Sequence, residues 1–187
     1  MERIYRQLTQ QEIDTLQLKG NESEDWEQIL VGEPFCCNRV RNNYFSGKIV
    51  IGAIDNGTLQ DEGLTLPEGI YNSRLKNCII GDHSAIHNVH FLAHYNVGDN
   101  VLLFNIDEMT SIRDKVNRIE PMNECGGRWI VPYNGMLIAD AYLWAKYRDH
   151  AILMNQLESY TKNMLTSDNG CLGVVGDNCV IMNSSTR

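Results

Sequence analysis

The sequence predicts a mostly β protein: a parallel β-helix with a helical lead-in and an inserted loop plus α-helix. Three observations predict this class. Aliphatic residues recur at a step of six through residues 80–108, the tetrapeptide Val-Gly-Asp-Asn occurs at both 97–100 and 175–178, and a clear helical segment at 139–165 lies between the two. A hexapeptide period is typical of a β-helix, in which each hexad supplies one short strand and one bend.

The hexad frame assigns a role to each position. The aliphatic residue points into a narrow core, the neighbouring inward place accepts only a small residue, and Gly or Asn serves the bend because both tolerate positive φ. Cys78, Ser84, Cys179 and Ser185 fall at the small inward place, and the frame also puts His90 at an inward place. The aliphatic place, with one step shortened to five residues, holds Ile80, Ile86, Leu92, Val97 and Leu103.

A helix is the rival interpretation of the same stretch. His83, His87, His90 and His94 are spaced by four, three and four residues, which is the spacing of one helical face. However, the stretch is rich in Gly and Asn, which are poor helix formers, and its aliphatic residues do not share a helical face. We therefore prefer the hexads.

The chain divides into four segments: a helical lead-in at 1–30, β-helix coils at 31–108, a loop and helix insertion at 109–170, and resumed coils at 171–187. In the lead-in, Thr9 and Glu12 form a capping-box pattern, and we expect this segment to cap the end of the coils. The last segment stops directly after a complete hexad with no capping element, so we expect the chain to be an N-terminal piece of a longer protein.

The inserted helix over 139–165 contains no Gly or Pro, and Asp140 is its expected N-cap. An apolar stripe on one helical face is larger than one short solenoid is expected to cover, so it predicts a homo-oligomer, most simply a trimer. The stripe consists of Leu143, Tyr147, Met154 and Leu157.

Composition limits the location and the partners. The formal net charge is −8, and no basic cluster is present, so nucleic acid is not an expected partner. No apolar run approaches the ~20 residues of a membrane span, and the first residues do not read as a secretory signal, so we expect a cytoplasmic protein without membrane contact. The six cysteines have no paired spacing, and we expect reduced thiols rather than disulfides or a structural zinc site.

Together the hexads at 70–108 and 175–186 resemble the left-handed β-helix, or hexapeptide-repeat, superfamily of bacterial transferases. The helical insertion and the Gly-Gly-Arg loop are also similar to an uncharacterised family of long bacterial hexapeptide proteins. The segment His-Phe-Leu-Ala-His-Tyr-Asn-Val-Gly-Asp-Asn at 90–100 is similar to the stretch of UDP-N-acetylglucosamine acyltransferases and lipid A N-acyltransferases that carries the general base. Here two residues rather than the usual three separate His94 from Val97-Gly98.

The resemblance implies that His94, with His90 as its neighbour, takes a proton from a sugar hydroxyl or amine that attacks a thioester. The donor would be acyl-CoA or an acyl-carrier thioester, the acceptor a sugar or sugar nucleotide, and no bound cofactor is expected. Asn96, Asn123 and the loop residues Gly126, Gly127 and Arg128 are candidate ligand-binding residues. The loop amides could approach a phosphate while Arg128 pairs with it, although a turn with a solvated Arg explains the same residues.

Two alternatives remain open. The chain could be a non-catalytic β-helix scaffold or sugar-nucleotide-binding module of a larger protein. The four histidines also suggest a metal site like that of γ-class carbonic anhydrases, with Asp82 or Asp99 as partners of the ligands. On the transferase hypothesis, replacing His94 by Ala lowers turnover, whereas replacing the inward His90 lowers stability.

Overall fold

The computed structural model describes residues 3–111, 118–120, 129–133, 135–167 and 173–183. The chain forms two compact units, Met1–Ser111 with Leu172–Arg187, and Ile112–Cys171. Within the described residues, no helix has both the length and the apolar character needed to cross a membrane.

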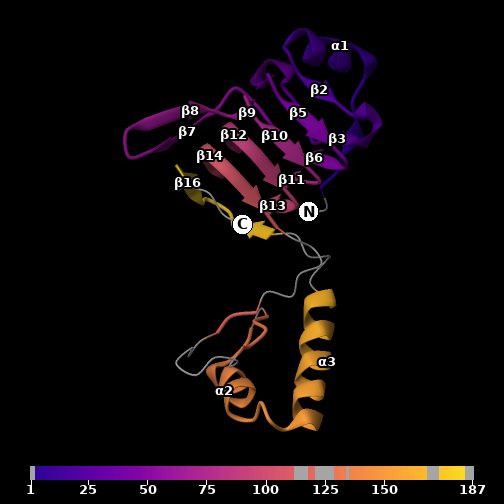
Figure 1. Cartoon of the computed structure of the whole chain (residues 1–187). Coiled ribbons are helices and arrows are strands. Elements are labelled where there is room, and N and C mark those ends of the chain that lie inside the picture. The colour runs from indigo at the N-terminus through magenta and orange to yellow at the C-terminus, as the bar shows by residue number, and fades with distance from the viewer. Residues whose placement is uncertain (1–2, 112–117, 121–128, 134, 168–172, 184–187) are drawn as a thin grey trace. The chain divides into compact units, whose positions relative to one another are not determined.

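The first unit is mostly β and consists of parallel sheets (Figure 1). Every described strand pair in it is parallel except β1 with β3 and the hairpin of β7 with β8. The expected mostly β class with parallel strands is therefore confirmed. The six-stranded sheet contains β1 (Arg6–Gln7), β3 (Ile29–Val31), β6 (Ile49–Ile51), β11 (Ile79–Ile80), β13 (Tyr95–Val97) and β15 (Gly173–Val175). The eight-stranded sheet contains β2 (Glu22–Ser23), β4 (Val40–Arg41), β5 (Tyr44–Ser46), β9 (Gly69–Tyr71), β10 (Arg74–Lys76), β12 (Ala85–Ala93), β14 (Leu102–Thr110) and β16 (Val180–Met182).

The strand register explains the shortened step in the hexad series. Leu75 pairs with Leu92, Ile80 with Val97, and Ile86 in β12 with Leu103 in β14, all at the same offset along the sequence. The number of residues from one partner of each pair to the other is one fewer than three full hexads. One of the three steps between paired positions is therefore five residues long instead of six. The step from Leu92 to Val97 is one place where this happens.

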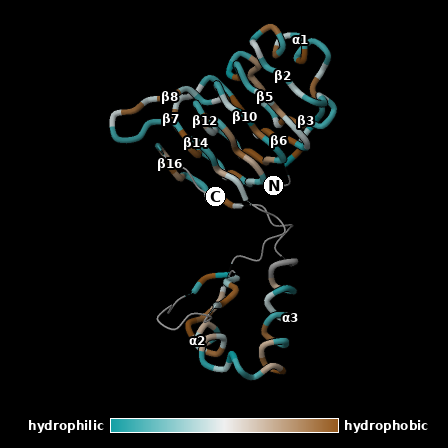
Figure 2. Tube along the Cα trace, viewed as in Figure 1, coloured by the Kyte–Doolittle hydropathy of each residue, from teal (hydrophilic) through white to brown (hydrophobic). Residues whose placement is uncertain are grey.

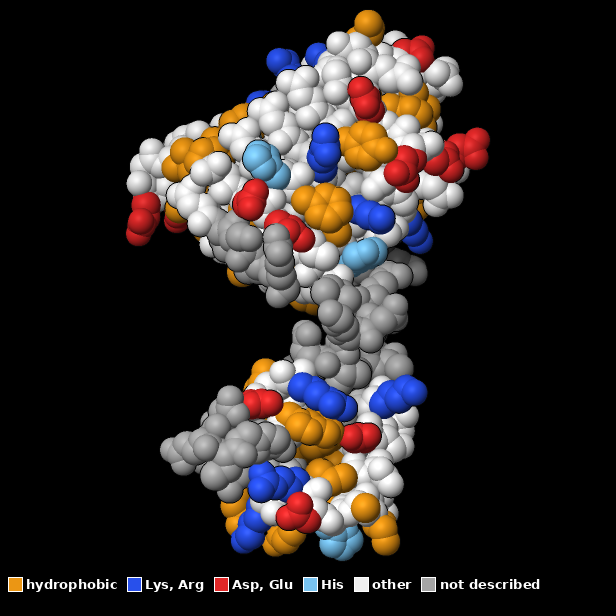
Figure 3. Space-filling view, viewed as in Figure 1, with side chains coloured by type: hydrophobic (Ala, Val, Ile, Leu, Met, Phe, Trp, Pro, Cys, Tyr) orange, Lys and Arg blue, Asp and Glu red, His pale blue; other side chains and the backbone are white. Residues whose placement is uncertain are grey.

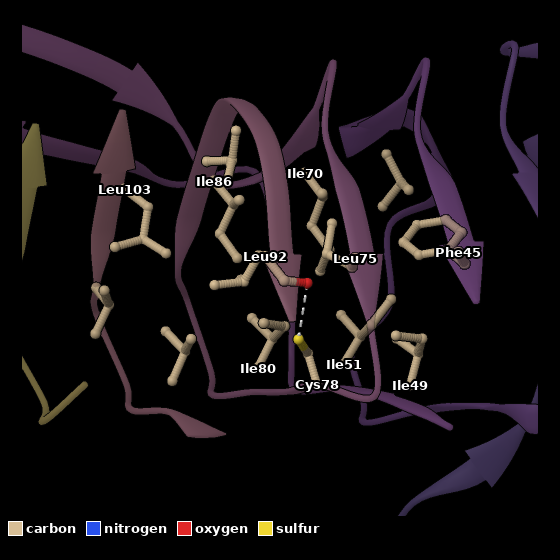
Figure 4. Packing of buried hydrophobic residues seen from close by; sticks show 14 of the residues in the cluster. Phe45, Ile49, Ile51, Ile70, Leu75, Cys78, Ile80, Ile86, Leu92 and Leu103 are labelled. Carbon is tan, nitrogen blue, oxygen red and sulfur yellow. Dashed lines mark hydrogen bonds between the residues drawn. The ribbon is translucent and has the colours of Figure 1, made fainter. Parts of the chain in front are cut away.

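The aliphatic series forms the core, as the hexads predict. All five residues of the series are at most 1% exposed. Figure 4 shows Ile80, Ile86, Leu92 and Leu103 pointing into the core. Cys78 is fully buried beside them, and its Sγ donates to the carbonyl oxygens of Lys76 at 3.2 Å and Leu92 at 3.4 Å. Ser84 is also buried and donates to the Gly98 carbonyl at 3.1 Å. The small inward place is thus confirmed for Cys78 and Ser84, and Ser185 lies outside the described residues.

Asparagine serves the bends, also as predicted. The side-chain amides of these asparagines form a ladder of hydrogen bonds from one bend to the next. Asn42 Nδ2 donates to Asn72 Oδ1 at 3.1 Å, and Asn72 Nδ2 donates to Asn88 Oδ1 at 2.9 Å. Such ladders satisfy polar groups at positions where an ordinary residue would be strained. The residues that share this bend and have φ between 50° and 54° are Asn42, Asn72, Asn88, Asn105 and Asn183.

A second bend is built from Gly-Asp pairs. The carboxylate of each Asp accepts the backbone N–H of the preceding coil: Asp82 from Ala53, Asp99 from Asp82, and Asp177 from Asp99, at 2.8 to 2.9 Å. The glycine before each Asp makes room for this contact. A Cβ at Gly98 would lie 2.3 Å from Asp177 Oδ1.

The helical alternative for residues 80–94 is wrong, and so is the inward placement of His90. Strand β12 covers most of the stretch, and Val89 rather than His90 fills the inward place, with Val89 fully buried and His90 exposed. The reason is a local lengthening. Five residues separate the positive-φ residues Asn88 and His94, whereas four separate Asn72 and Asn77 on the neighbouring coil. The extra residue turns His90 outward.

The lead-in contains the expected helix, α1 (Gln10–Leu18), and the capping box of Thr9 and Glu12 is confirmed. Strands β1, β2 and β3 also lie in this segment and pair with the sheets, so residues 1–30 are more than a cap. Hydrophobic and hydrophilic stretches are interspersed along the strands that follow (Figure 2), and β6 is hydrophobic throughout. The sequence did not predict the antiparallel hairpin of β7 (Thr58–Asp61) and β8 (Leu64–Pro67), which interrupts the coils expected at 31–108.

The second unit corrects the single helix expected over 139–165. It contains α2 (Ile138–Lys146) and α3 (Ala151–Ser167), separated by a polar turn in which His150 Nδ1 accepts the N–H of Leu153 at 3.2 Å. Asp140 is not the N-cap: it lies inside α2, and its carboxylate accepts the N–H of Leu137 at 2.9 Å. Because the helix breaks, the expected stripe is not one face, and Tyr147 is 41% exposed. Trp144, Ile130 and Val131 are the buried centre of this unit, with Met154 and Leu157 packed against them.

Candidate functional site

The candidate site lies on the outer surface of the eight-stranded sheet, where β2, β5, β10 and β12 present a groove with a volume of about 610 Å³. Glu22 pairs with Tyr44, and Tyr44 with Arg74, so these three outward side chains form a row across the strands. On this face, aromatic and other hydrophobic side chains lie among basic, acidic and His side chains (Figure 3). The polar and aromatic residues that line the groove are Glu22, Asn42, Asn43, Tyr44, Asn72, Ser73, Arg74 and His90.

The floor of the groove is held by buried asparagines. Asn43, 3% exposed, donates through Nδ2 to Asn21 Oδ1 at 2.9 Å and to the Ile70 carbonyl at 2.8 Å. Its Oδ1 accepts the N–H of Ser73 at 2.9 Å. Because the backbone beneath Tyr44 and Arg74 is cross-linked in this way, the two outward side chains start from fixed positions.

His90 is the predicted catalytic residue that the structure brings to the groove. Its side chain is 79% exposed, and its Nδ1 lies 3.3 Å from Asp107 Oδ1 on the neighbouring strand β14. A carboxylate beside one ring nitrogen fixes the tautomer of an imidazole and leaves the other nitrogen to exchange a proton with a ligand. No sequence motif indicates this pair, because its members lie on different coils and only the strand register of β12 and β14 brings them together.

His94 lies elsewhere. It is half-buried at a bend with φ of 59°, where its N–H donates to Lys76 O at 2.9 Å and its carbonyl accepts from Gly173 N at 2.8 Å. It does not line the groove, and four residues of strand place it ~13 Å from His90 along the chain. The two histidines are therefore not neighbours in one site.

The remaining predicted ligand residues do not join the groove. Asn96 is exposed on β13, a strand of the other sheet, where it pairs in register with Ile79. Asn123, Gly126, Gly127 and Arg128 lie outside the described residues.

Two other histidines are occupied at the base of the β7–β8 hairpin. His83 Nδ1 lies 3.1 Å from Glu68 Oε2, and the Glu68 side chain is 9% exposed and also accepts the N–H of Asp55 at 3.1 Å. His87 is buried, stacks on Tyr71 with ring centroids 4.4 Å apart, and donates through Nε2 to the Pro67 carbonyl at 2.8 Å. Burial lowers the pKa of His87, which keeps the ring neutral.

The chain is recognised by one family model. The model described as "Domain of unknown function (DUF4954)" matches residues 5–187. The chain belongs to this family. An uncharacterised protein of Treponema pallidum (strain Nichols) is 36% identical over 194 residues, which cover 96% of this chain and 27% of the relative. The chain thus spans about a quarter of the length of that relative. No solved structure matches the chain.

The histidines at 83, 87, 90 and 94 do not assemble into one site. In the part of the chain that the structure describes, no three His, Cys, Asp or Glu side chains are grouped so that they could hold a metal ion. Asp82 and Asp99, the expected partners of metal-bound histidines, bind backbone N–H groups and form an ion pair with Arg3 instead. What remains for chemistry is the groove, which offers an aromatic ring, side-chain amides, one guanidinium and one imidazole beside a carboxylate.

Proposed function

We propose that this domain binds a sugar-containing ligand in the groove and, in the longer proteins of its family, acts as an acyltransferase-like domain. The observation that carries the proposal is the meeting of Tyr44, Arg74 and His90 in one groove of ligand size, with Asp107 beside His90. A sugar ring has an apolar C–H face that packs on an aromatic ring, and hydroxyl groups at its edge that bond to amides and charged side chains. The groove supplies both kinds of partner.

The fold class that goes with this function is a left-handed parallel β-helix of the hexapeptide-repeat superfamily. Its support is the buried aliphatic series, the recurrent positive-φ bends and the constant parallel register between successive coils. A fold of this type hosts unrelated activities, so the function is argued from the groove and not from the fold.

In the proposed reaction His90 acts as the general base. Its Nε2 takes the proton of an acceptor hydroxyl or amine as that group attacks the carbonyl carbon of an acyl thioester from CoA or a carrier protein. The C–S bond then breaks, and the leaving thiolate receives the proton that His90 returns. Asp107 holds Nδ1 and stabilises the imidazolium that forms between the two transfers.

A binding role without catalysis is the second candidate, and one observation favours it. His90 and Asp107 are 79% and 76% exposed, so water screens their interaction, and base catalysis is strongest where water is excluded. On this hypothesis the domain is a sugar-binding module of a larger protein.

We also propose that the chain works as a homotrimer in the cytoplasm. The support for assembly is the set of exposed apolar side chains on α2 and α3, among them Ile138 at 91% and Ile152 at 68%. Light scattering at micromolar concentration should report a multiple of the 21.3 kDa chain mass, and a monomer would contradict the assembly.

The function is tested by separating binding from turnover. NMR titration of the 187-residue chain with mono- and oligosaccharides should shift the amides of β5, β10 and β12, and release of free thiol from an acyl-CoA should depend on the bound sugar. His90→Ala should lower thiol release by about 10²–10⁴-fold while it changes the dissociation constant little. His94→Ala is the discriminating variant: if it, and not His90→Ala, abolishes release, the base is the one that the resemblance implies. Absence of binding by every saccharide would refute the proposal.

A further inference from the structure

The positive charge of the groove lies at its centre, and the inference from it rests on the proposed function. Strand β10 has β5 on one side and β12 on the other, with β2 and β14 beyond them. Arg74, on β10, is the one Lys or Arg side chain among the residues that line the groove. Glu22 on β2 and Asp107 on β14 are each two strands away from it, on opposite sides. The row of strands therefore has a cation in the middle and a carboxylate at either end.

The Arg74 guanidinium is available to a ligand. The residue is exposed, and within the described part of the chain no carboxylate is close enough to form an ion pair with it, whereas Arg3 and Arg6 are both paired. Two strand spacings place the backbone of Glu22 ~10 Å from that of Arg74. Two unit charges at this distance in water change an affinity by only about twofold, and salt reduces the effect further. The terminal carboxylates thus do not cancel the attraction of Arg74 for an anion.

A single guanidinium in this position suits a single carboxylate. Its planar donors match the two oxygens of a carboxylate and bind them through two parallel hydrogen bonds. A diphosphate usually needs several cationic side chains, or backbone N–H groups at a helix N-terminus or Gly-rich loop. The groove has one guanidinium, its walls are strands and bends, and a second phosphate group would have to lie toward Glu22 or Asp107.

Aromatic side chains stand on both sides of this guanidinium. Tyr44 on β5 pairs with Arg74, and on the other side the register of β10 with β12 makes half-buried Phe91 the neighbour of Arg74. Figure 3 shows basic side chains beside aromatic rings on this face. A sugar ring whose C–H face packs on Tyr44 can therefore direct a carboxylate substituent to Arg74 on the next strand.

We infer that the groove takes an acidic saccharide, an oligosaccharide in which one unit carries a single carboxylate, in preference to a neutral saccharide or a sugar nucleotide. The carboxylate binds Arg74, its ring lies on Tyr44, and the adjoining unit reaches His90 on β12. Such a saccharide has hydroxyl groups and no amine. The acceptor atom of the proposed transfer is then a hydroxyl oxygen, whose proton passes to His90 as the oxygen attacks the thioester carbonyl carbon and then to the thiolate released when the C–S bond breaks.

The inference is tested by NMR titration of the 187-residue chain with three ligands. These are a xylotriose that carries one glucuronic acid unit, the methyl ester of the same compound, and UDP-N-acetylglucosamine. The ester has almost the same shape as the acid and no charge. In 50 mM salt the acid should bind at least threefold more tightly than the ester, because an ion pair at an exposed site contributes up to about fivefold. In 500 mM salt this ratio should fall, and UDP-N-acetylglucosamine should bind more weakly than the acid.

Variants separate the guanidinium from the overall charge of the chain. Arg74→Gln should abolish the preference for the acid and leave the dissociation constant of the ester within about twofold, whereas Tyr44→Ala should weaken both ligands. Arg74→Lys keeps the charge but not the planar pair of donors, so it should retain only part of the preference. Lys48→Gln makes the same change of charge at an exposed residue outside the groove lining and should alter nothing.

Each outcome has a consequence. Equal binding of the acid and its ester, or tighter binding of UDP-N-acetylglucosamine, would overturn the inference and leave the proposed sugar-binding function standing. Equal effects of Arg74→Gln and Lys48→Gln would also overturn it, since overall charge would then explain the preference. Binding of other saccharides but not of the acid would have the same meaning. Failure of every saccharide to bind would refute the proposed function itself.

Discussion

Gly98→Ala and Gly176→Ala change the same residue of the same tetrapeptide, Val-Gly-Asp-Asn, yet the structure predicts a large loss of stability for the first and almost none for the second. A Cβ at Gly98 would lie 2.3 Å from Asp177 Oδ1, 2.7 Å from Asp177 N and 2.9 Å from Gly176 C. Two of these atoms belong to backbone, so the next coil must move. At Gly176 the nearest atom to an added Cβ among the described residues is Cys179 Sγ, at an ordinary 3.8 Å.

The magnitude follows from two terms. Forcing one extra carbon into a packed position costs ~1–3 kcal/mol. Moving the coil also breaks the hydrogen bond from Asp99 N to Asp177 Oδ1, now 2.9 Å, which is worth ~1 kcal/mol. Gly98→Ala should therefore lower the free energy of unfolding by about 2 to 4 kcal/mol. Gly176→Ala should leave it within about 0.5 kcal/mol of the unchanged chain.

Urea denaturation followed by circular dichroism gives both values, and the thermal midpoint gives a second reading. In a chain of this size each kcal/mol corresponds to ~2–4 °C. Equal losses for the two variants would refute the reasoning, because they would mean that the contact of stacked coils does not set the glycine requirement. A stable Gly98→Ala chain would refute it more directly, since the ladder of Asp carboxylates would then tolerate a displaced coil.

Three further changes have defined outcomes. Glu12 binds Arg6 through both carboxylate oxygens at 2.8 Å, which lowers the pKa of Glu12 to about 2. Because the Arg6 side chain is 35% exposed, solvent screens this ion pair, and Glu12→Gln should lower the free energy of unfolding at pH 7 by only about 1 to 2 kcal/mol. A carboxyl group with a lowered pKa stabilises the folded chain above pH ~4.5, and this stabilisation is lost as the pH falls toward 2. The free energies of unfolding of the unchanged chain and of Glu12→Gln, measured in urea, should therefore converge over that range. A constant difference between them would contradict the ion pair. Burial raises the pKa of the Cys78 thiol to about 11, so little reactive thiolate forms at pH 8. In the folded chain iodoacetamide at pH 8 should label half-buried Cys36 at least tenfold faster than Cys78, as followed by mass spectrometry. Equal labelling rates would mean that the core is open. Thr161 is 1% exposed and its hydroxyl has no hydrogen-bond partner among the described residues, so Thr161→Val should raise the thermal midpoint of the second unit. A lower midpoint would contradict this, because it would mean that the valine has removed a hydrogen bond.

The core could be predicted from the sequence because its physics leaves a periodic trace. A parallel stack of short strands buries an aliphatic residue at fixed intervals, and the series from Ile80 to Leu103 obeys this interval closely enough to be recognised. Bends are equally visible, since positive φ restricts them to Asn, Gly and a few others. The break between α2 and α3 could not be predicted from the sequence, because the turn between them, at 148–150, contains neither Gly nor Pro.

The groove could not be predicted in the same way. Its side chains point outward, where packing does not limit the residue type, and they come from different coils, so that Tyr44 and Arg74 meet only through the strand register. The placement of His90 failed for a related reason. The aliphatic series continues on both sides of the additional residue between Asn88 and His94. The six-residue period therefore does not indicate that His90, which lies between them, faces outward instead of inward.

The acidic residues of this fold illustrate how structural and functional roles separate. Asp82, Asp99 and Asp177 look like candidates for chemistry because they recur beside Gly and Asn, yet one carboxylate oxygen of each is occupied by a backbone N–H of the preceding coil. Removing such a group should affect stability first. Asp107 makes no such ladder contact with the described coils, is 76% exposed, and contacts His90 on the groove side of the sheet. An acid that the stack does not need for its own folding is the one that can take part in recognising a ligand, and for this reason the pair of His90 and Asp107, rather than the repeated Asp series, is the place to look for function.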